Sequence, residues 1–323
     1  KYALLFLCTL AAALSSFMPN PVVVLMLAPL AIEIATRLKA SLFLYLVCLA
    51  ISSNVVTTVS MVADPPSLIL AMETGMRFLD FYWFQNRLGL GTLSVIGVAV
   101  ALLTLLIQFR GLNNKVEISP QPVKMGYGGL TTFVLSVLAL SFIPTGYAGT
   151  IGLVVGVLSL LLLRNKAGSA LKDVDWASLA FLVGIFIVVA SVEQVGILKD
   201  VANWLTGTGL TSSVAILAIL TWISVALSSF IDNVPYTVLM IPTCTYIAQA
   251  MGVSPWPFYF GMLVGTGIGG NITPVGATAN VLACGMLEKR GYKIELGKYM
   301  KISVPFTIAP VLAVQLLLQW LWL

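Results

Sequence analysis

Histidine is absent from this chain of 323 residues, and charged residues make up only 9% of it. The lack of histidine excludes imidazole ligands for a metal and imidazole acid–base chemistry. Any proton coupling must therefore use carboxylates or lysines. Soluble domains carry roughly 25% charged residues, so the scarcity of charge excludes an ordinary soluble domain.

Cysteine is also scarce. The cysteines all fall within apolar segments and show none of the close spacings of a metal site: Cys8, Cys48, Cys244 and Cys284. We predict that they are free, buried, small apolar side chains. We expect no cofactor and no metal centre, with a bound Na+ left open as the exception.

Apolar sequence is what the chain has in abundance. Hydrophobic residues make up 59% of it, and the mean hydropathy is +1.02. Runs near the roughly 20 residues that span a bilayer recur along its whole length. We therefore predict an all-α polytopic membrane protein without a separate soluble domain. Its expected partners are the lipid bilayer and a small ion or small-molecule substrate, with no nucleic acid.

A polar break interrupts the apolar run 214–251, where Asp232, Asn233 and Pro235 occur at residues 228–235. A similar break lies 213 residues earlier, at residues 15–21. The offset places Ser15, Ser16, Phe17 and Asn20 on Ser228, Ser229, Phe230 and Asn233. Polar breaks in matching places of two halves point to the binding centre of a transporter.

The same offset predicts two repeats. Residues 1–110 form the C-terminal part of the first repeat, with a re-entrant helical hairpin (1–40), a broken transmembrane helix (41–72) and a span (88–109). A loop (111–124) leads to the second repeat (125–323), with scaffold spans (125–197), a hairpin (214–251), a broken helix (257–287) and a last span (302–323). Each arm of the first hairpin has about 14 residues, too short to cross a bilayer.

The first repeat has no scaffold spans before its hairpin, whereas the second has three. We therefore expect about three further helices before Lys1 in the natural protein.

The predicted topology also fixes an orientation. Five crossings separate the hairpins, so the hairpins enter from opposite faces and the repeats are inverted. Every Lys and Arg other than Arg77, Arg87 and Lys199 then lies on the face of the first hairpin's mouth. The excess of positive charge makes that face cytoplasmic. We expect a protein of the cell (inner) membrane, with its first hairpin opening to the cytoplasm and its C-terminus outside.

Helices that stop inside the membrane expose N–H groups at their N-termini and C=O groups at their C-termini. The N-termini attract anions, and the carbonyls bind sodium. The predicted cation-coupling residues are Asp232, Asn233, Gly270, Asn271, Thr273 and Gly276. The predicted substrate-binding residues are Ser15, Ser16, Asn20, Asn54, Asp64, Ser228, Ser229 and Asn280. The glycines of the predicted second break (265–276) are expected to approach a ligand closely and to take positive φ.

Structural alternatives stay open for several of these residues. The glycines could serve tight helix packing, and Asp64 could simply cap the helix that follows it. Asp232 could be a neutral, hydrogen-bonded acid at a loop tip, although an intramembrane carboxylate is by default a functional hypothesis. Glu33 lies four residues before Arg37, which favours a helical ion pair over a ligand.

Two stretches carry a family resemblance: Ser-Ser-Phe-Ile-Asp-Asn-Val-Pro at 228–235, with Pro242, and Gly-Gly-Asn-Ile-Thr-Pro-Val-Gly-Ala-Thr-Ala-Asn at 269–280. They resemble the ion transporter superfamily, in the branch of arsenite-efflux pumps, D-type sodium/proton antiporters and the melanosomal P protein, which is related to divalent anion:sodium symporters. The resemblance implies a scaffold, a mobile transport part, elevator-type alternating access, sodium or proton coupling and a homodimer. The first repeat departs from this pattern, because Pro19 stands where an aspartate is common.

We therefore predict a secondary active transporter rather than an enzyme. Its substrate is a small inorganic or organic anion, an oxyacid or a cation, and its transport is coupled to Na+ or H+. The chain has no intramembrane Arg or Lys that could hold a bulky, citrate-like anion by charge. The alternative is a non-transporting accessory subunit that retains the transporter fold inside a larger membrane complex.

Overall fold

The computed structural model describes residues 1–112, 147–163, 176–198 and 212–323, with a few positions between them (131, 135, 138–139, 167–168, 200 and 207). These ranges are mostly helical and contain one small antiparallel sheet. An all-α fold is thereby confirmed in outline. The predicted scaffold span at 125–143 and most of the loop at 111–124 fall outside the described residues.

The helices follow the predicted order. The first part contains α1 (Tyr2–Ser15), α2 (Asn20–Arg37), α3 (Leu42–Asn54), α4 (Pro65–Thr74) and α5 (Leu90–Gln108). Between α4 and α5 lie a 3-10 helix, η1 (Phe78–Phe81), and the hairpin of β1 (Trp83–Phe84) and β2 (Arg87–Leu88). Next come α7 (Ala148–Leu163) and α9 (Trp176–Val195). The last part contains α11 (Ser213–Ser228), α12 (Asn233–Met251), α13 (Trp256–Gly269), α14 (Thr278–Glu288) and α15 (Leu296–Trp322).

The structure repeats at the sequence offset of 213. The second arm of each hairpin starts at equivalent residues, Asn20 and Asn233, and α4 and α14 start at the equivalent Pro65 and Thr278. Two side-chain hydrogen bonds recur at the same offset. Ser67 donates to the Thr57 carbonyl, as Asn280 does to the Gly270 carbonyl. Ser60 donates to the Ser16 carbonyl, as Thr273 does to the Ser229 carbonyl. The sequence repeat is therefore also a repeat of local structure.

One arm of the first hairpin is longer than predicted. The arms contain 14 residues in α1 and 18 in α2, so the expectation of about 14 residues is right for α1 and wrong for α2. The arms of the second hairpin contain 16 residues in α11 and 19 in α12. The tips are correspondingly short, since Pro21 and Pro235 lie inside the first turn of α2 and α12. Proline is tolerated there because the first N–H groups of a helix have no intrahelical partner.

Some described helices are long and apolar enough to cross a membrane. Among the described ranges these are α2, α5 and α15. The apolar helices α1, α3 and α11 are shorter, as is the stretch 149–162 of α7. The length argument for a re-entrant first hairpin therefore does not hold for α2.

The second break is shorter than predicted, because α13 continues through Gly265 and Gly267 to Gly269. A Cβ atom on Gly265 would meet the Thr221 carbonyl oxygen of α11, and one on Gly269 would lie 2.6 Å from the Val225 Cα atom. These two glycines serve close packing of α13 on α11. None of the glycines at 265–276 has a positive φ, so that expectation is wrong.

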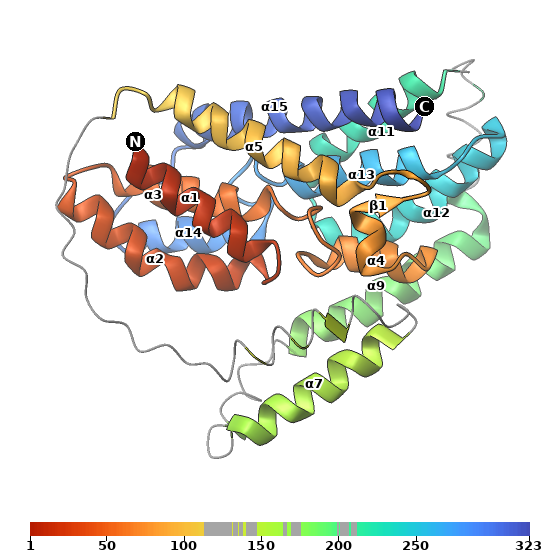
Figure 1. Ribbon diagram of the computed structural model, residues 1–323, viewed down its shortest axis with the longest axis horizontal. Helices are drawn as coiled ribbons and strands as arrows, with labels where there is room; N and C mark the ends of the chain where they lie inside the picture. The colour runs from red at the N-terminus through yellow and green to blue at the C-terminus, as the bar shows by residue number, and fades with distance from the viewer. Residues whose placement is uncertain are drawn as a thin grey trace.

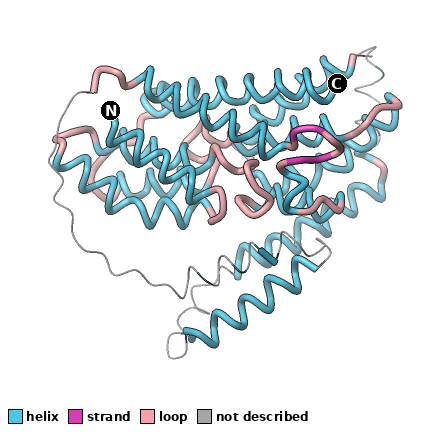
Figure 2. Tube along the Cα trace, in the orientation of Figure 1, coloured by secondary structure: helices cyan, strands magenta, loops and turns pink. Residues whose placement is uncertain are grey.

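The two helical hairpins point toward each other (Figure 1). The first has its open end near the N-terminus, and the second has its open end at the far side of the molecule. Between them lie α3 and α13, which are buried from Leu44 to Asn54 and from Pro257 to Gly269. Each second half-helix crosses to the other hairpin: α14 packs on α2, and α4 packs on α12. Figure 2 shows that the loops of the two breaks meet in the middle of the molecule.

Gly265→Ala should destabilise the protein because its added methyl group meets the α11 backbone. We expect a loss of about 1 to 3 kcal/mol in unfolding free energy, as for overpacked cores. Gly285→Ala in α14 is the matched control, since a Cβ there has no heavy atom within 4 Å. The control should be neutral or slightly stabilising. Thermal unfolding of both variants measures the difference, and equal midpoints would contradict the packing role of Gly265.

Candidate functional site

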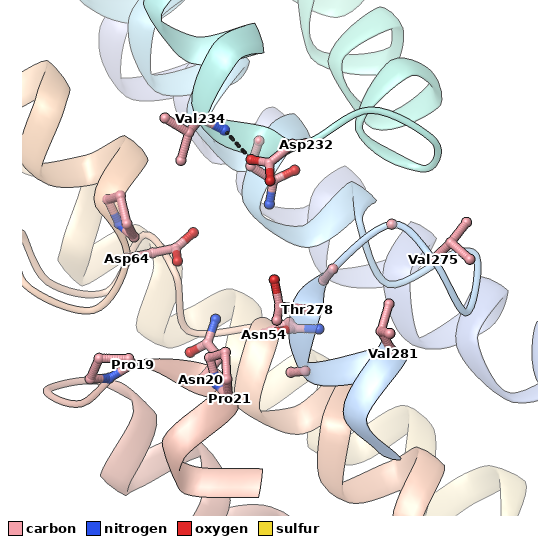
Figure 3. A pocket seen from close by; sticks show the side chains of 15 residues that line it. Pro19, Asn20, Pro21, Asn54, Asp64, Asp232, Val234, Val275, Thr278 and Val281 are labelled. Carbon is pink, nitrogen blue, oxygen red and sulfur yellow. Dashed lines mark hydrogen bonds between the residues drawn. The ribbon is translucent and has the colours of Figure 1, made fainter. Parts of the chain in front are cut away.

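Both tips and both breaks open onto one cavity of about 410 Å³ (Figure 3). The first tip contributes Pro19 and Asn20, and the second contributes Asp232 and Asn233. The lining residues from the breaks and the half-helices are Asn54, Asp64, Pro65, Val275, Gly276, Ala277, Thr278, Ala279 and Val281. Segments more than 200 residues apart in the sequence thus share one site.

The structure divides the predicted site residues into two groups. Those that line the cavity are Asn20, Asn54, Asp64, Asp232, Asn233 and Gly276. Those that lie outside its lining are Ser15, Ser16, Ser228, Ser229, Gly270, Asn271, Thr273 and Asn280. Thr278 lines the cavity and was not predicted. Its signal was available, because the offset places it on Pro65, directly after Asp64.

Asp232 begins α12. Its Oδ1 accepts a hydrogen bond from the Val234 N–H at 2.9 Å, and the side chain is exposed. The structural alternative for this residue is thus partly realised, since it caps a helix. Asp232 also belongs to the lining of the cavity.

Asp64 stands at the start of α4 but makes no capping hydrogen bond with its side chain. Prolines occupy the next two positions and have no N–H to donate. No hydrogen bond or ion pair to the Asp64 carboxylate occurs within the described ranges. The alternative that Asp64 serves only as a cap is therefore wrong, and its carboxylate faces the cavity (Figure 3).

Three asparagines connect the two breaks beside the cavity. Asn54 Nδ2 donates to Asn271 Oδ1 at 2.9 Å and to Asn280 Oδ1 at 3.0 Å. In turn, Asn271 donates to the Ile51 carbonyl, and Asn280 donates to the carbonyls of Gly270 and Thr273. These partners fix the orientation of all three amides. The network holds the end of α3 against the start of α14.

The two tips differ in how their polar groups are satisfied. At the second tip, Ser228 Oγ donates to Asn233 Oδ1 at 2.5 Å and also lies 2.6 Å from the Thr266 carbonyl. At the first tip, the equivalent Ser15 Oγ and Asn20 Oδ1 are buried and have no hydrogen-bond partner among the described residues. Buried polar atoms without a partner are rare and call for an explanation, such as an ion or a water.

The charges at the cavity are all of one sign. Among the described residues, its lining includes two carboxylates, Asp64 and Asp232, and contains no Lys or Arg. Elsewhere in the described ranges, the ion pair predicted between Glu33 and Arg37 is confirmed, with 2.5 Å between Glu33 Oε1 and Arg37 Nη2. All four cysteines are free and buried, as predicted.

Comparisons with known proteins agree with these observations. A family model described as "Citrate transporter" matches residues 1–265. An uncharacterized transporter of Mycobacterium tuberculosis is 28% identical over 99% of this chain and 77% of its own length. An uncharacterized transporter of Synechocystis is 24% identical over 99% of this chain and 78% of its own length.

The human P protein is also similar. It is 24% identical over 94% of this chain and 47% of its own length. The resemblance to the superfamily and to its P-protein branch is thereby confirmed.

Proposed function

Because this chain belongs to the citrate transporter family and is an integral membrane protein, we propose that it is a secondary active transporter coupled to Na+ or H+. The observation that carries the proposal is the single cavity at which both tips and both breaks converge. Broken helices in corresponding places of two repeats are how such transporters build a central site.

The coupling ion, in this proposal, is held by acceptor oxygens. Asp64 and Asp232 supply negative charge, and Asn20 supplies a buried Oδ1 without a partner. Oxygen ligands of this kind suit a hard cation such as Na+. We extend the predicted cation site from the second tip to the first, because Asn20 lines the cavity and its Oδ1 has no hydrogen-bond partner among the described residues.

The proposed movement is of the elevator type, between inverted repeats. The two hairpins approach from opposite ends of the molecule, which supports the inversion (Figure 1). Gln108, near the end of α5, donates to the Lys301 carbonyl in α15. This bond places a basic residue of α15 beside the end of α5, in support of a cytoplasmic face at the open end of the first hairpin. The homodimer and the inner-membrane location remain proposals from the family resemblance.

The substrate is proposed to be a small anion or oxyacid that binds together with the coupling cation. An anion beside two carboxylates would be repelled unless a cation separates them. A polycarboxylate such as citrate would need several such cations, because no basic side chain of the described residues lines the cavity. The charge of the site therefore favours one anionic group over three.

Reconstitution of the full-length protein into liposomes tests the function. Uptake of candidate solutes should follow an imposed Na+ or proton gradient. Asp232→Asn should lower uptake about tenfold, the effect of one lost charged contact of roughly 1.4 kcal/mol. Asparagine is as good a helix cap as aspartate, so the fold should be kept. Inactivity of the wild type under every gradient would favour the accessory subunit, and full activity of the variant would remove Asp232 from the mechanism.

A further inference from the structure

A second cavity, of about 440 Å³, lies between α4, α9 and α12 (Figure 1). It shares none of the residues that line the central cavity. The ring of Tyr259 in α13 also lines it. Its volume is in the range of sites for small organic ligands. Its apolar lining residues are Ile69, Val189, Ala190, Val238, Ile241 and Pro242.

Two exposed carboxylates lie at this cavity. Glu73 belongs to the last turn of α4, and Glu193 belongs to the last turn of α9. The last turn of a helix carries free carbonyl groups and partial negative charge, so it favours a cation and not a carboxylate alone. Glu193 Oε1 accepts a hydrogen bond from the Tyr246 hydroxyl at 3.1 Å. Within the described ranges, Glu73 has no hydrogen bond or ion pair, and no Lys or Arg lines the cavity.

Pro242 adds an unpaired carbonyl group to the same wall. It lies inside α12 and has no N–H, so the Val238 carbonyl four residues earlier lacks its usual helical donor. No side chain among the described residues donates to that carbonyl. Both residues line the cavity. This acceptor belongs to the backbone and is independent of the two carboxylates.

The hydroxyl groups at the cavity have already used their protons. Thr74 Oγ1 donates to the Leu70 carbonyl at 2.6 Å, and Thr245 Oγ1 donates to the Ile241 carbonyl at 3.0 Å. Because Thr245 has a single proton, the Tyr259 hydroxyl is the donor in its 2.6 Å contact with Thr245 Oγ1. The described lining therefore offers acceptors and negative charge. A complementary ligand supplies hydrogen-bond donors and positive charge.

An organic cation fits this lining better than a metal ion. The described residues contain no group of three or more carboxylates or thiols that could hold a metal. Much of the cavity wall is apolar, and such a wall gains from contact with hydrocarbon. An ammonium group has three N–H donors and carries the required charge.

We propose that this cavity binds a primary ammonium group that carries an apolar chain. The ammonium group donates to Glu73, Glu193 and the Val238 carbonyl, and the chain packs on the apolar lining. A free alkylamine and the headgroup of phosphatidylethanolamine share this chemistry, and the experiments below distinguish them.

The consequence for transport rests on the proposed function. There, α9 belongs to the scaffold spans, whereas α4 and α12 belong to the part that moves. In the structure α9 packs against α12, and the bond from Tyr246 to Glu193 joins these two helices. A ligand in the cavity touches α4, α9 and α12 together. It therefore holds the two parts in this arrangement and slows uptake.

Thermal unfolding of the full-length protein in dodecyl maltoside tests binding without transport. The probes are hexylammonium chloride and hexanol at constant ionic strength, which have equal chains but differ in charge. A ligand that binds the folded state raises the unfolding midpoint. Glu73→Gln and Glu193→Gln each remove one charge, and glutamine keeps an oxygen that can accept from Tyr246. Glu288→Gln, at the end of α14 and outside the lining, is the matched control.

Hexylammonium should raise the midpoint of the wild type, and hexanol at the same concentration should not. Each cavity variant should need about fivefold more hexylammonium for the same rise, since an exposed ion pair contributes up to about 1 kcal/mol. Glu288→Gln should behave as the wild type. A wild type that hexylammonium does not stabilise would overturn the site, as would the same hexylammonium dependence in all three variants.

Short-chain phosphatidylethanolamine, added to the same samples, distinguishes the two sources. A higher midpoint in the wild type but not in the cavity variants would identify the lipid headgroup as a ligand, and an unchanged midpoint would identify a free amine. In liposomes under a Na+ gradient, hexylammonium should slow uptake at the concentrations that stabilise the protein. Unchanged uptake at those concentrations would overturn the bridge between α9 and α12. Absence of all uptake would count against the proposed function alone, since binding is measured separately.

Discussion

Asp64→Asn should nearly abolish gradient-driven uptake while leaving the protein as stable as the wild type. The Asp64 carboxylate has no hydrogen bond and no ion pair in the described part of the chain, and it lines the cavity. Its removal therefore breaks no contact that holds the fold. Within a site that must attract a cation, the loss of its charge should lower uptake by about 100-fold, equivalent to roughly 2.7 kcal/mol of charged contact.

The comparison with Asp232→Asn sharpens this expectation. Both substitutions remove one charge from the cavity, but Asp232 already uses one oxygen to cap α12. The effect of Asp64→Asn on uptake should therefore be the larger of the two. Uptake under Na+ and proton gradients, measured beside thermal unfolding, checks both variants. Wild-type uptake by Asp64→Asn would exclude Asp64 as a cation ligand, and a large loss of stability would indicate a structural role instead.

The sequence predicted the helical character of the described part of the chain, because proline and polar residues interrupt apolar runs where helices end. Asn20 and Asn233 begin the second hairpin arms at the predicted offset. Helix bounds were harder to predict. Gly265 and Gly269 resemble loop glycines, but they lie within α13 and pack against α11. A glycine pattern alone does not tell a close approach to a ligand from a close approach to another helix.

The cavity lies where the predicted tips and breaks meet, but only some of the predicted site residues line it. Composition identified the polar side chains near the breaks, yet hydrogen bonding decides which of them face the cavity. Asn271 and Asn280 are turned toward Asn54 and backbone carbonyls, whereas Asp64 makes no such bond. Thr278 lines the cavity but was missed, although the offset places it on Pro65, directly after Asp64.

Asn54→Leu should cause a large loss of stability. Leucine has a similar size but cannot donate, so Asn271 Oδ1 and Asn280 Oδ1 would be left buried without their shared donor. Each unsatisfied buried acceptor costs about 1 to 3 kcal/mol, so we expect a loss of about 2 to 6 kcal/mol. Ser53→Ala is the neighbouring control: Ser53 Oγ donates only to the Ala50 carbonyl of its own helix, and its loss should cost about 1 kcal/mol.

Asn54→Asp distinguishes a fixed network from one that can rearrange. The aspartate would place a carboxylate oxygen against two amide oxygens. Asn271 Nδ2 donates to the Ile51 carbonyl, and Asn280 Nδ2 donates to the Gly270 carbonyl. Neither asparagine can therefore turn its amide nitrogen toward the aspartate without leaving that backbone carbonyl unpaired. The Asp variant should therefore unfold at least as readily as the Leu variant in thermal denaturation. Wild-type stability of Asn54→Asp would mean that the amides of Asn271 and Asn280 can reverse. The asparagine network would then not hold the end of α3 against the start of α14.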